Sequence, residues 1–327
     1  MEISYRALKK IEIEPDDEIV IFCTVGDEIY FLPHFLDFYR KLGVNKFYIL
    51  VDHSTDGTLE YLQSQDDCAI FLTDNDFSKR VNLKYGEKKY SQCVGTLWKT
   101  LIPKQHLQGK WVLIVDADEF LQLPPGCEKI QELTALLEKN NHNSCRALMI
   151  DFFPKFLKDI KEYGVSDSPF SICPFFDPIE VAWDDNAVQP KFINTENNVR
   201  NRIVDKMLAE HPAQTEKINA QKIKWQFKTP LIKFNENTIH IDAHRTNHAP
   251  PGDIQCVLAH FKFQPHWERK VDWAIESKAH YLGSLKYQPL GFAKMHLQNW
   301  NLLCPHSVEY RSKRDLENNN LIFNSLS

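Results

Sequence analysis

The chain has 327 residues, enough to bury a sizeable core as one large domain or two smaller ones. Its 39 basic and 44 acidic residues give a formal net charge of −5, which does not supply the positive field that attracts nucleic acid. No apolar run approaches the roughly 20 residues that span a bilayer, and the first residues lack the apolar segment of a signal peptide. We therefore expect a cytoplasmic protein that has no transmembrane segment and binds no nucleic acid.

The eight cysteines are scattered, without a CxxC pair, and most stand among apolar residues. This pattern is typical of small core residues in a reducing compartment. It does not indicate a disulfide framework or a zinc site.

The first part of the chain alternates apolar strands with helices. Strands are expected over 18–23, 46–51, 69–73 and 111–115, and helices after residues 27 and 57 and over 87–107. Asp27 is expected to be the N-cap of the first helix, and Gly43 is expected to end it. Such alternation predicts a parallel sheet with right-handed crossovers. Ligands of these sheets bind at the carboxyl ends of the strands, where Thr24, Asp52 and Asp116 all fall. One cleft can therefore collect these three residues.

Beyond residue 126 the pattern predicts a helix over 127–139, a strand over 144–152, and short strands over 231–234, 238–241 and 255–263. An amphipathic helix is expected over 265–282, and the rest of the chain is expected to be helical and peripheral. The predicted fold class is α/β, with a Rossmann-like, mainly parallel sheet flanked by helices over residues 1–264. A helical C-terminal extension follows over 265–327.

Acidic residues follow the core strand 111–115 at once. An Asp-x-Asp motif brings the carboxylates of Asp116 and Asp118 within reach of one hard cation. Such a cation can also hold and neutralise a diphosphate. A solvated exit from the strand is the alternative, and the motif alone does not decide between them.

The segment HFKF near the end of the chain offers a third ligand. Alternation along a strand places His260 and Lys262 on one face. A neutral imidazole can complete a Mn²⁺ shell that two carboxylates begin, and Lys262 can neutralise phosphate as a point charge. His244, in IHIDAHRTNH, is the competing histidine, and a purely structural His260 is the other alternative.

Three segments together resemble glycosyltransferase family 2, in particular its bacterial branch. They are VGDEIYFLPHFLDFYRKLGVNKFYILVDHSTDGT, WVLIVDADEFL and LAHFKF, within a likeness that runs from about Ile19 to Tyr287. The resemblance implies a glycosyltransferase-A fold, a divalent cation (Mn²⁺ or Mg²⁺) and a nucleotide-sugar donor, with a UDP-sugar expected first. Residues 1–125 would form the nucleotide-sugar half and 126–264 the acceptor half. Two stretches depart from the family: Val25-Gly26-Asp27-Glu28 replaces Arg-Asn-Glu, and DHSTDGT is one residue shorter than DDGSTDGT.

The resemblance also implies roles for single residues. Asp52 would contact the nucleotide base or ribose, unless it caps the next turn, and Glu119 would orient a neighbour from outside the metal shell. The metal ligands would be Asp116, Asp118 and His260. The other donor contacts would be Thr24, Gln92, Asp116 and Lys262.

The implied reaction is attack by an acceptor hydroxyl on the anomeric carbon of the donor sugar. Inversion needs a carboxylate base near that hydroxyl, and the candidates are Asp151 and Asp177. The acceptor would be a glycan or a lipid-linked sugar of a bacterial surface polysaccharide or lipopolysaccharide, with peripheral contact at the inner face of the membrane. A catalytically inactive protein that binds nucleotide or sugar, or acts as a scaffold, is the alternative. A phosphatase with an aspartate nucleophile is a second enzyme class that begins with acids after an apolar strand. Its DxDxT motif would need threonine where this chain has Phe120.

Overall fold

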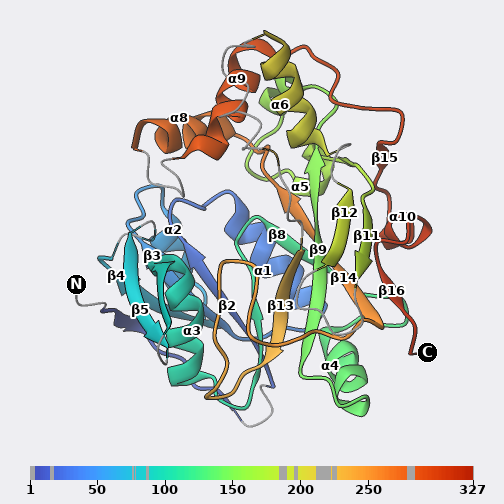
Figure 1. The fold of residues 1–327 in the computed structure, drawn as a ribbon. Helices are drawn as coiled ribbons and strands as arrows, with labels where there is room; N and C mark the ends of the chain where they lie inside the picture. Colours follow the sequence, from blue (N-terminus) through green and yellow to red (C-terminus); the bar gives the residue numbers. More distant parts are fainter. Residues whose placement is uncertain are drawn as a thin grey trace.

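The computed structural model describes residues 4–14, 18–75, 77, 79–85, 88–183, 190–194, 198–210, 222, 227–277 and 284–326. Most strands join one large sheet with helices on both faces (Figure 1). Its first half is parallel and runs in the order β4 (Cys68–Thr73), β3 (Phe47–Asp52), β2 (Ile19–Val25) and β7 (Trp111–Ile114). β1 (Arg6–Lys9) pairs antiparallel with β4 at the edge. The predicted strands of this half are confirmed.

The second half of the sheet is mixed, so the prediction of a mainly parallel sheet is only partly right. β13 (Phe227–Lys233) lies antiparallel between β7 and β9 (Ser144–Phe153), because it enters the sheet from the opposite end. β14 (Ile254–Phe261) pairs parallel with β9 and antiparallel with β8 (Glu119–Gln122). The strand predicted over 238–241 does not form; His240 makes only an isolated bridge to Thr246.

The strands of the parallel half are apolar at successive positions because both faces of the sheet are covered. Phe22 of β2 packs in the cluster that includes Trp98 of α3 (Val94–His106). Its neighbour Ile21 packs in the opposite cluster, which includes Phe35 of α1 (Phe31–Leu42). As predicted, α1 ends at Gly43, whose φ of 106° lies in the left-handed region that favours glycine.

Two local predictions are wrong. The helix expected over 87–107 begins only at Val94, because β5 (Arg80–Tyr85) and β6 (Lys88–Cys93) pair as an antiparallel hairpin before it. Asp27 does not cap α1; its Oδ1 instead accepts a hydrogen bond from the backbone N–H of Thr55 at 2.6 Å. The lone pairs of Asp27 therefore hold the loop after β3 and not the start of the helix.

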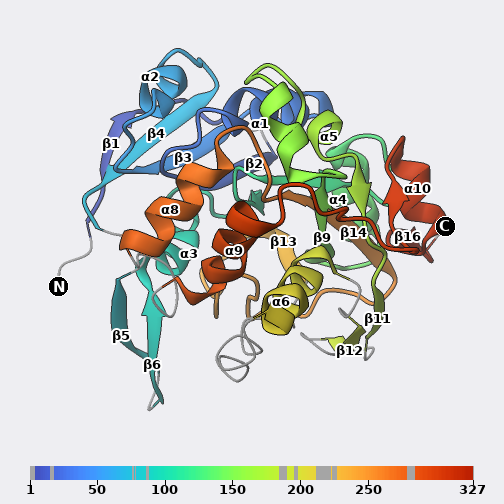
Figure 2. The ribbon, with the colours of Figure 1, turned by 90° about the horizontal axis from the view of Figure 1, so that it is seen from above.

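The C-terminal part belongs to the sheet as well as to the helices, so it is not a purely helical, peripheral extension. β15 (Val308–Glu309) pairs with β10 (Phe175–Phe176), and β16 (Phe323–Asn324) pairs with β14. α8 (Trp267–Ser277) and α9 (Gln288–His296) lie with α6 (Val199–Glu210) at the end toward which β9 points (Figure 1). Seen from above, α8 and α9 lie over the middle of the molecule (Figure 2).

None of the helices within the described ranges is long and apolar enough to cross a membrane.

Several shorter elements complete the described chain. The remaining elements are α2 (Thr58–Gln63), α4 (Ile130–Lys139), η1 (Leu157–Glu162), α5 (Pro169–Ile172), β11 (Glu180–Trp183), β12 (Pro190–Asn194), η3 (Leu285–Tyr287) and α10 (Lys313–Asn318).

The order of the strands defines a switch point between β2 and β7. From β2 the chain proceeds outward to β3 and β4, and it then returns to form β7 on the other side of β2. In open α/β sheets, ligands bind outside the carboxyl ends of the strands at such a point. The loop after β2 and the turn after β7, which carry Glu28 and Asp118, both begin there.

Candidate functional site

The turn after β7 holds the acidic motif. β7 ends at Ile114, and the chain turns through Asp116 and Asp118 before β8 begins at Glu119. The backbone N–H of Glu119 donates to the Asp116 carbonyl at 3.0 Å, and the Glu119 carboxylate accepts the Asp116 N–H at 2.9 Å. These two hydrogen bonds close the turn, and Glu119 is only 1% exposed.

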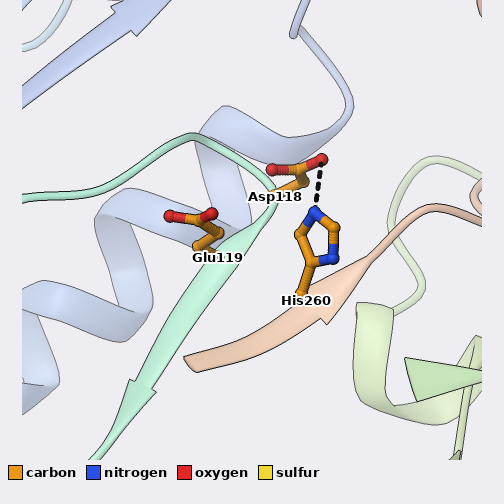
Figure 3. Close-up of side chains that lie close together, drawn as sticks. All are labelled: Asp118, Glu119 and His260. Atoms are coloured by element: carbon orange, nitrogen blue, oxygen red, sulfur yellow. Dashed lines mark ion pairs between the residues drawn. The ribbon is translucent and has the colours of Figure 1, made fainter. Parts of the chain in front are cut away.

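Strand register then sets three polar residues in a row across β8, β14 and β9. His260 on β14 pairs with Glu119 on one side and with Asp151 on the other. Asp118, just before β8, lies with its Oδ2 3.7 Å from Nε2 of His260 (Figure 3). Each of Asp118, Glu119 and His260 offers one ligand atom, and these atoms lie within 4.8 Å of one another. We call these three residues the metal-ligand group.

Asp151 orients the imidazole of His260. Its Oδ1 lies 2.6 Å from Nδ1 of His260, and Arg200 donates to both of its oxygens at 2.7 and 2.8 Å. Burial works against ionisation of Asp151, but Arg200 and His260 hold its pKa well below the usual range. The carboxylate therefore accepts a hydrogen bond from Nδ1–H, so the neutral tautomer of His260 has its lone pair on Nε2, the nitrogen nearer Asp118. Histidines that bind metals commonly have such a partner on the other ring nitrogen.

The metal-ligand group fits a divalent cation in its donor atoms. Two carboxylates and one imidazole suit ions such as Mn²⁺. Lysines also contact these carboxylates: Lys262 lies 2.6 Å from Asp118, and Lys228 lies 2.5 Å from Glu119. Burial opposes ionisation of Asp118, yet the nearby ammonium of Lys262 holds its pKa well below the usual range. Asp118 is therefore an anion that a cation can share with Lys262.

Asp116 lies outside this group, although the sequence motif predicts it as a ligand. Its two oxygens contact Lys99 of α3 at 2.8 Å and Lys228 of β13 at 3.0 Å, and its side chain is 39% exposed. Partial desolvation opposes its ionisation, but Lys228 and Lys99 hold its pKa well below the usual range. Glu119, predicted to act from outside the metal shell, occupies the position expected of Asp116.

His244, the competing histidine, also lies outside the metal-ligand group. Its Nδ1 is 3.1 Å from the Phe227 carbonyl oxygen. Burial, together with the nearby charge of Lys228, lowers the pKa of His244 to about 3. It is a neutral structural histidine beside β13.

Both candidate bases are held in ion pairs. Asp151 orients His260, as described above. Asp177 contacts Arg202 at 2.6 Å and accepts from Ser307 at 2.6 Å, with a side chain that is 2% exposed. Burial raises the pKa of Asp177, and Arg202 opposes that shift. These contacts favour structural roles for both aspartates.

The predicted donor contacts are spread around the sheet. Thr24 and Asp52 lie at the carboxyl ends of β2 and β3, as expected, and Asp52 accepts the Phe77 N–H at 3.2 Å. Gln92 lies on β6 and not on a helix, and its Nε2 donates to the His240 carbonyl at 2.6 Å. The side-chain amide of Gln92 therefore bonds within the protein.

Sequence reasoning missed four charged residues around the site. Lys99 and Lys228 stand inside apolar stretches, WKTLI and FKTPLI, which is the signal that could have marked them as buried partners of acids. Glu28, in the loop after β2, forms an ion pair with Lys270 of α8. Nothing in the sequence pairs Glu28 with a helix so far along the chain.

No model of a known protein family matches this chain, and a comparison with curated proteins finds no match either.

Proposed function

We propose that the protein is a metal-dependent glycosyltransferase that moves a sugar from a nucleoside-diphosphate donor to a hydroxyl of a glycan or lipid-linked acceptor. The observation that carries this proposal is the buried metal-ligand group of Asp118, Glu119 and His260. It stands beside the switch point of the sheet, where α/β folds bind ligands. The segments DADEF and HFKF, which carry the resemblance to glycosyltransferase family 2, supply all three residues.

The charges around the group support transfer with a diphosphate leaving group. A divalent cation at this position supplies positive charge for phosphate oxygens. Lys262, which directly follows β14, is a partly exposed ammonium beside Asp118, with 26% of its side chain accessible. Lys99 pairs with Asp116, and Lys228 pairs with both Asp116 and Glu119, so the charges of these two carboxylates are neutralised by lysines. Because three lysines balance the three carboxylates, the charge of a bound cation would remain available to the negative charge that develops on the diphosphate.

The same ion pairs favour one alternative. The carboxylates of Asp116, Asp118 and Glu119 each already have a lysine partner. A protein that binds a nucleotide sugar through its lysines, without a cation and without transfer, would show the same arrangement. Dependence on metal therefore separates the two functions.

The test is release of nucleoside diphosphate from purified protein with a panel of UDP-, GDP- and dTDP-sugars, with and without Mn²⁺. We expect release from at least one donor only with metal, and its loss in Asp118→Asn. Asp242→Asn, which alters an ion pair with Arg245 away from the group, is the control and should behave as wild type. Binding of a donor without release under any metal condition would favour the non-catalytic alternative.

A further inference from the structure

The strand β8, which begins with Glu119, is paired with another strand along one edge only. Its partner is β14, and among the strands of the described chain none pairs along its other edge. All four residues of β8 are buried, so bulk water does not reach that edge. Buried backbone N–H and C=O groups need hydrogen-bond partners, and those of the second edge must find them elsewhere.

A single side chain of α1 satisfies this second edge. The phenol of Tyr39 donates to the Glu119 carbonyl at 2.9 Å and accepts the Leu121 backbone N–H at 3.1 Å. A phenolic hydroxyl can make both bonds because it carries a proton as well as lone pairs. Tyr39 therefore takes the place that a neighbouring strand would have beside β8.

Packing fixes the phenol in this position. Tyr39 is 0% exposed, and the centroid of its ring lies 4.8 Å from that of Phe35 and 5.1 Å from that of Phe38. Phe38 in turn contacts Phe120 of β8, with ring centroids 5.2 Å apart. Burial raises the pKa of Tyr39 well above its usual value, so the hydroxyl keeps the proton that it donates.

The backbone of Glu119 needs such support if its carboxylate binds a metal. Ligand distances in a metal site are held to within about 0.2 Å. Glu119 is the first residue of β8, directly after the turn, and β14 holds it from one side only. The bond from Tyr39 fixes the Glu119 carbonyl from the other side, and with it the direction in which the side chain leaves the backbone.

We propose that Tyr39 is a positioning residue of the metal-ligand group. Its hydroxyl holds the start of β8 so that the Glu119 carboxylate meets the same cation as Asp118 and His260. The proposal rests on the metal-ligand group of the proposed function. Tyr39 acts through Glu119 and touches neither the cation nor the donor.

The experiment is a Mn²⁺ titration of the full chain in which electron paramagnetic resonance measures free Mn²⁺. Tyr39→Phe removes the hydroxyl and keeps the ring. Tyr30→Phe is the matched control, because Tyr30 is also buried and also donates to a backbone carbonyl, that of Asp167 at 3.0 Å, away from the metal-ligand group. Both changes are repeated in a Glu119→Gln background, and circular dichroism checks that each variant is folded.

We expect the Kd for Mn²⁺ to rise about tenfold in Tyr39→Phe, as is typical when a group that orients a metal ligand is lost. Tyr30→Phe should stay within about threefold of wild type. In the Glu119→Gln background, Tyr39→Phe should change the Kd by less than about threefold, because the ligand that it positions is absent. An unchanged Kd in Tyr39→Phe, or an equal rise in both backgrounds, overturns the proposal.

A second measurement needs no variant. Because coupling between two equilibria is reciprocal, Mn²⁺ should strengthen the contact of Tyr39 with β8 in wild type. Hydrogen exchange of the Leu121 amide, followed by mass spectrometry, should slow severalfold when Mn²⁺ is added, and an unchanged rate contradicts the proposal. Wild type that binds no Mn²⁺ refutes the metal-ligand group and the proposed function with it. Mn²⁺ binding that does not depend on Tyr39 refutes this inference alone.

Discussion

His260 and Asp151 face each other on adjacent parallel strands, and Nδ1 of His260 lies 2.6 Å from Oδ1 of Asp151. Because an ionised carboxylate only accepts hydrogen bonds, this contact keeps the imidazole proton on Nδ1. Arg200 holds Asp151 from the other side. In the neutral imidazole the lone pair is therefore on Nε2, which lies 3.7 Å from Oδ2 of Asp118.

This relationship predicts that Asp151 controls metal affinity without being a ligand. Asp151→Asn should weaken Mn²⁺ binding about 10–100-fold, because the amide no longer enforces the tautomer of His260. Calorimetric titration with MnCl₂ measures the change. Asp177→Asn is the matched control, since Asp177 is an equally buried aspartate paired with Arg202 outside the metal-ligand group. Equal Mn²⁺ affinity in Asp151→Asn and wild type would show that the pair is only structural.

The buried pair of Glu119 and Lys228 should matter to stability. Their side chains are 1% and 4% exposed, and removing the charge of Glu119 leaves buried Lys228 with Asp116 alone, whose side chain is 39% exposed. Glu119→Gln should lower the free energy of unfolding by on the order of 3 kcal/mol, as measured by urea denaturation. The double variant Glu119→Gln/Lys228→Met should recover part of that loss, because it removes both charges. A double variant less stable than the sum of the single changes would contradict this explanation.

His240 should make the protein sensitive to mild acid. Burial, with Lys99 and Lys228 nearby, lowers the pKa of His240 to about 3, whereas an unfolded histidine titrates near 6.5. Below about pH 6.5 the unfolded state takes up a proton that the native state does not, so stability is lost as pH falls toward 3. The cost is about 1.4 kcal/mol per pH unit.

Unfolding in urea between about pH 7.5 and 4.5 tests this sign. The stability of His240→Leu should fall less steeply with acid than that of wild type, and the exposed His306→Leu should follow wild type. Parallel curves for wild type and His240→Leu would show that His240 is protonated in the native state.

Asp52 provides a test of nucleotide recognition. If its carboxylate contacts the nucleotide, Asp52→Ala should weaken binding of uridine diphosphate by about 1–3 kcal/mol in calorimetry. Asp52 also accepts the Phe77 N–H, so a lower melting temperature is expected in either case. Unchanged nucleotide affinity with a lower melting temperature would assign Asp52 to the loop alone.

The parts of the fold that the sequence predicts are those with continuous local signals. The apolar runs of β2, β3 and β7 and the amphipathic α1 need no tertiary information, and the likeness of HFKF to a known family was enough to nominate His260. Glu119 could not be chosen over Asp116, because the choice depends on the break after Ile114 and on the pairing of β8 with β14. Long-range pairing, which no local pattern contains, decides which carboxylate faces His260.

The ion pairs of the site also join residues far apart in the sequence, so no local pattern predicts them. Lys228 and Lys270 come from β13 and α8, far along the chain from the acids that they contact. The hairpin of β5 and β6 was also missed, so Gln92 was placed on a helix. Only the three-dimensional arrangement shows that its amide bonds the His240 carbonyl.

The most direct test of the central claim is a Mn²⁺ titration of five proteins: wild type, Asp118→Asn, His260→Ala, Asp116→Asn and His244→Ala. Wild type should bind one ion. Asp118→Asn and His260→Ala should each weaken binding at least about tenfold, as expected for the loss of one ligand, while Asp116→Asn and His244→Ala stay within about threefold. Wild-type affinity in both Asp118→Asn and His260→Ala, with the loss appearing in Asp116→Asn or His244→Ala, would contradict the metal-ligand group.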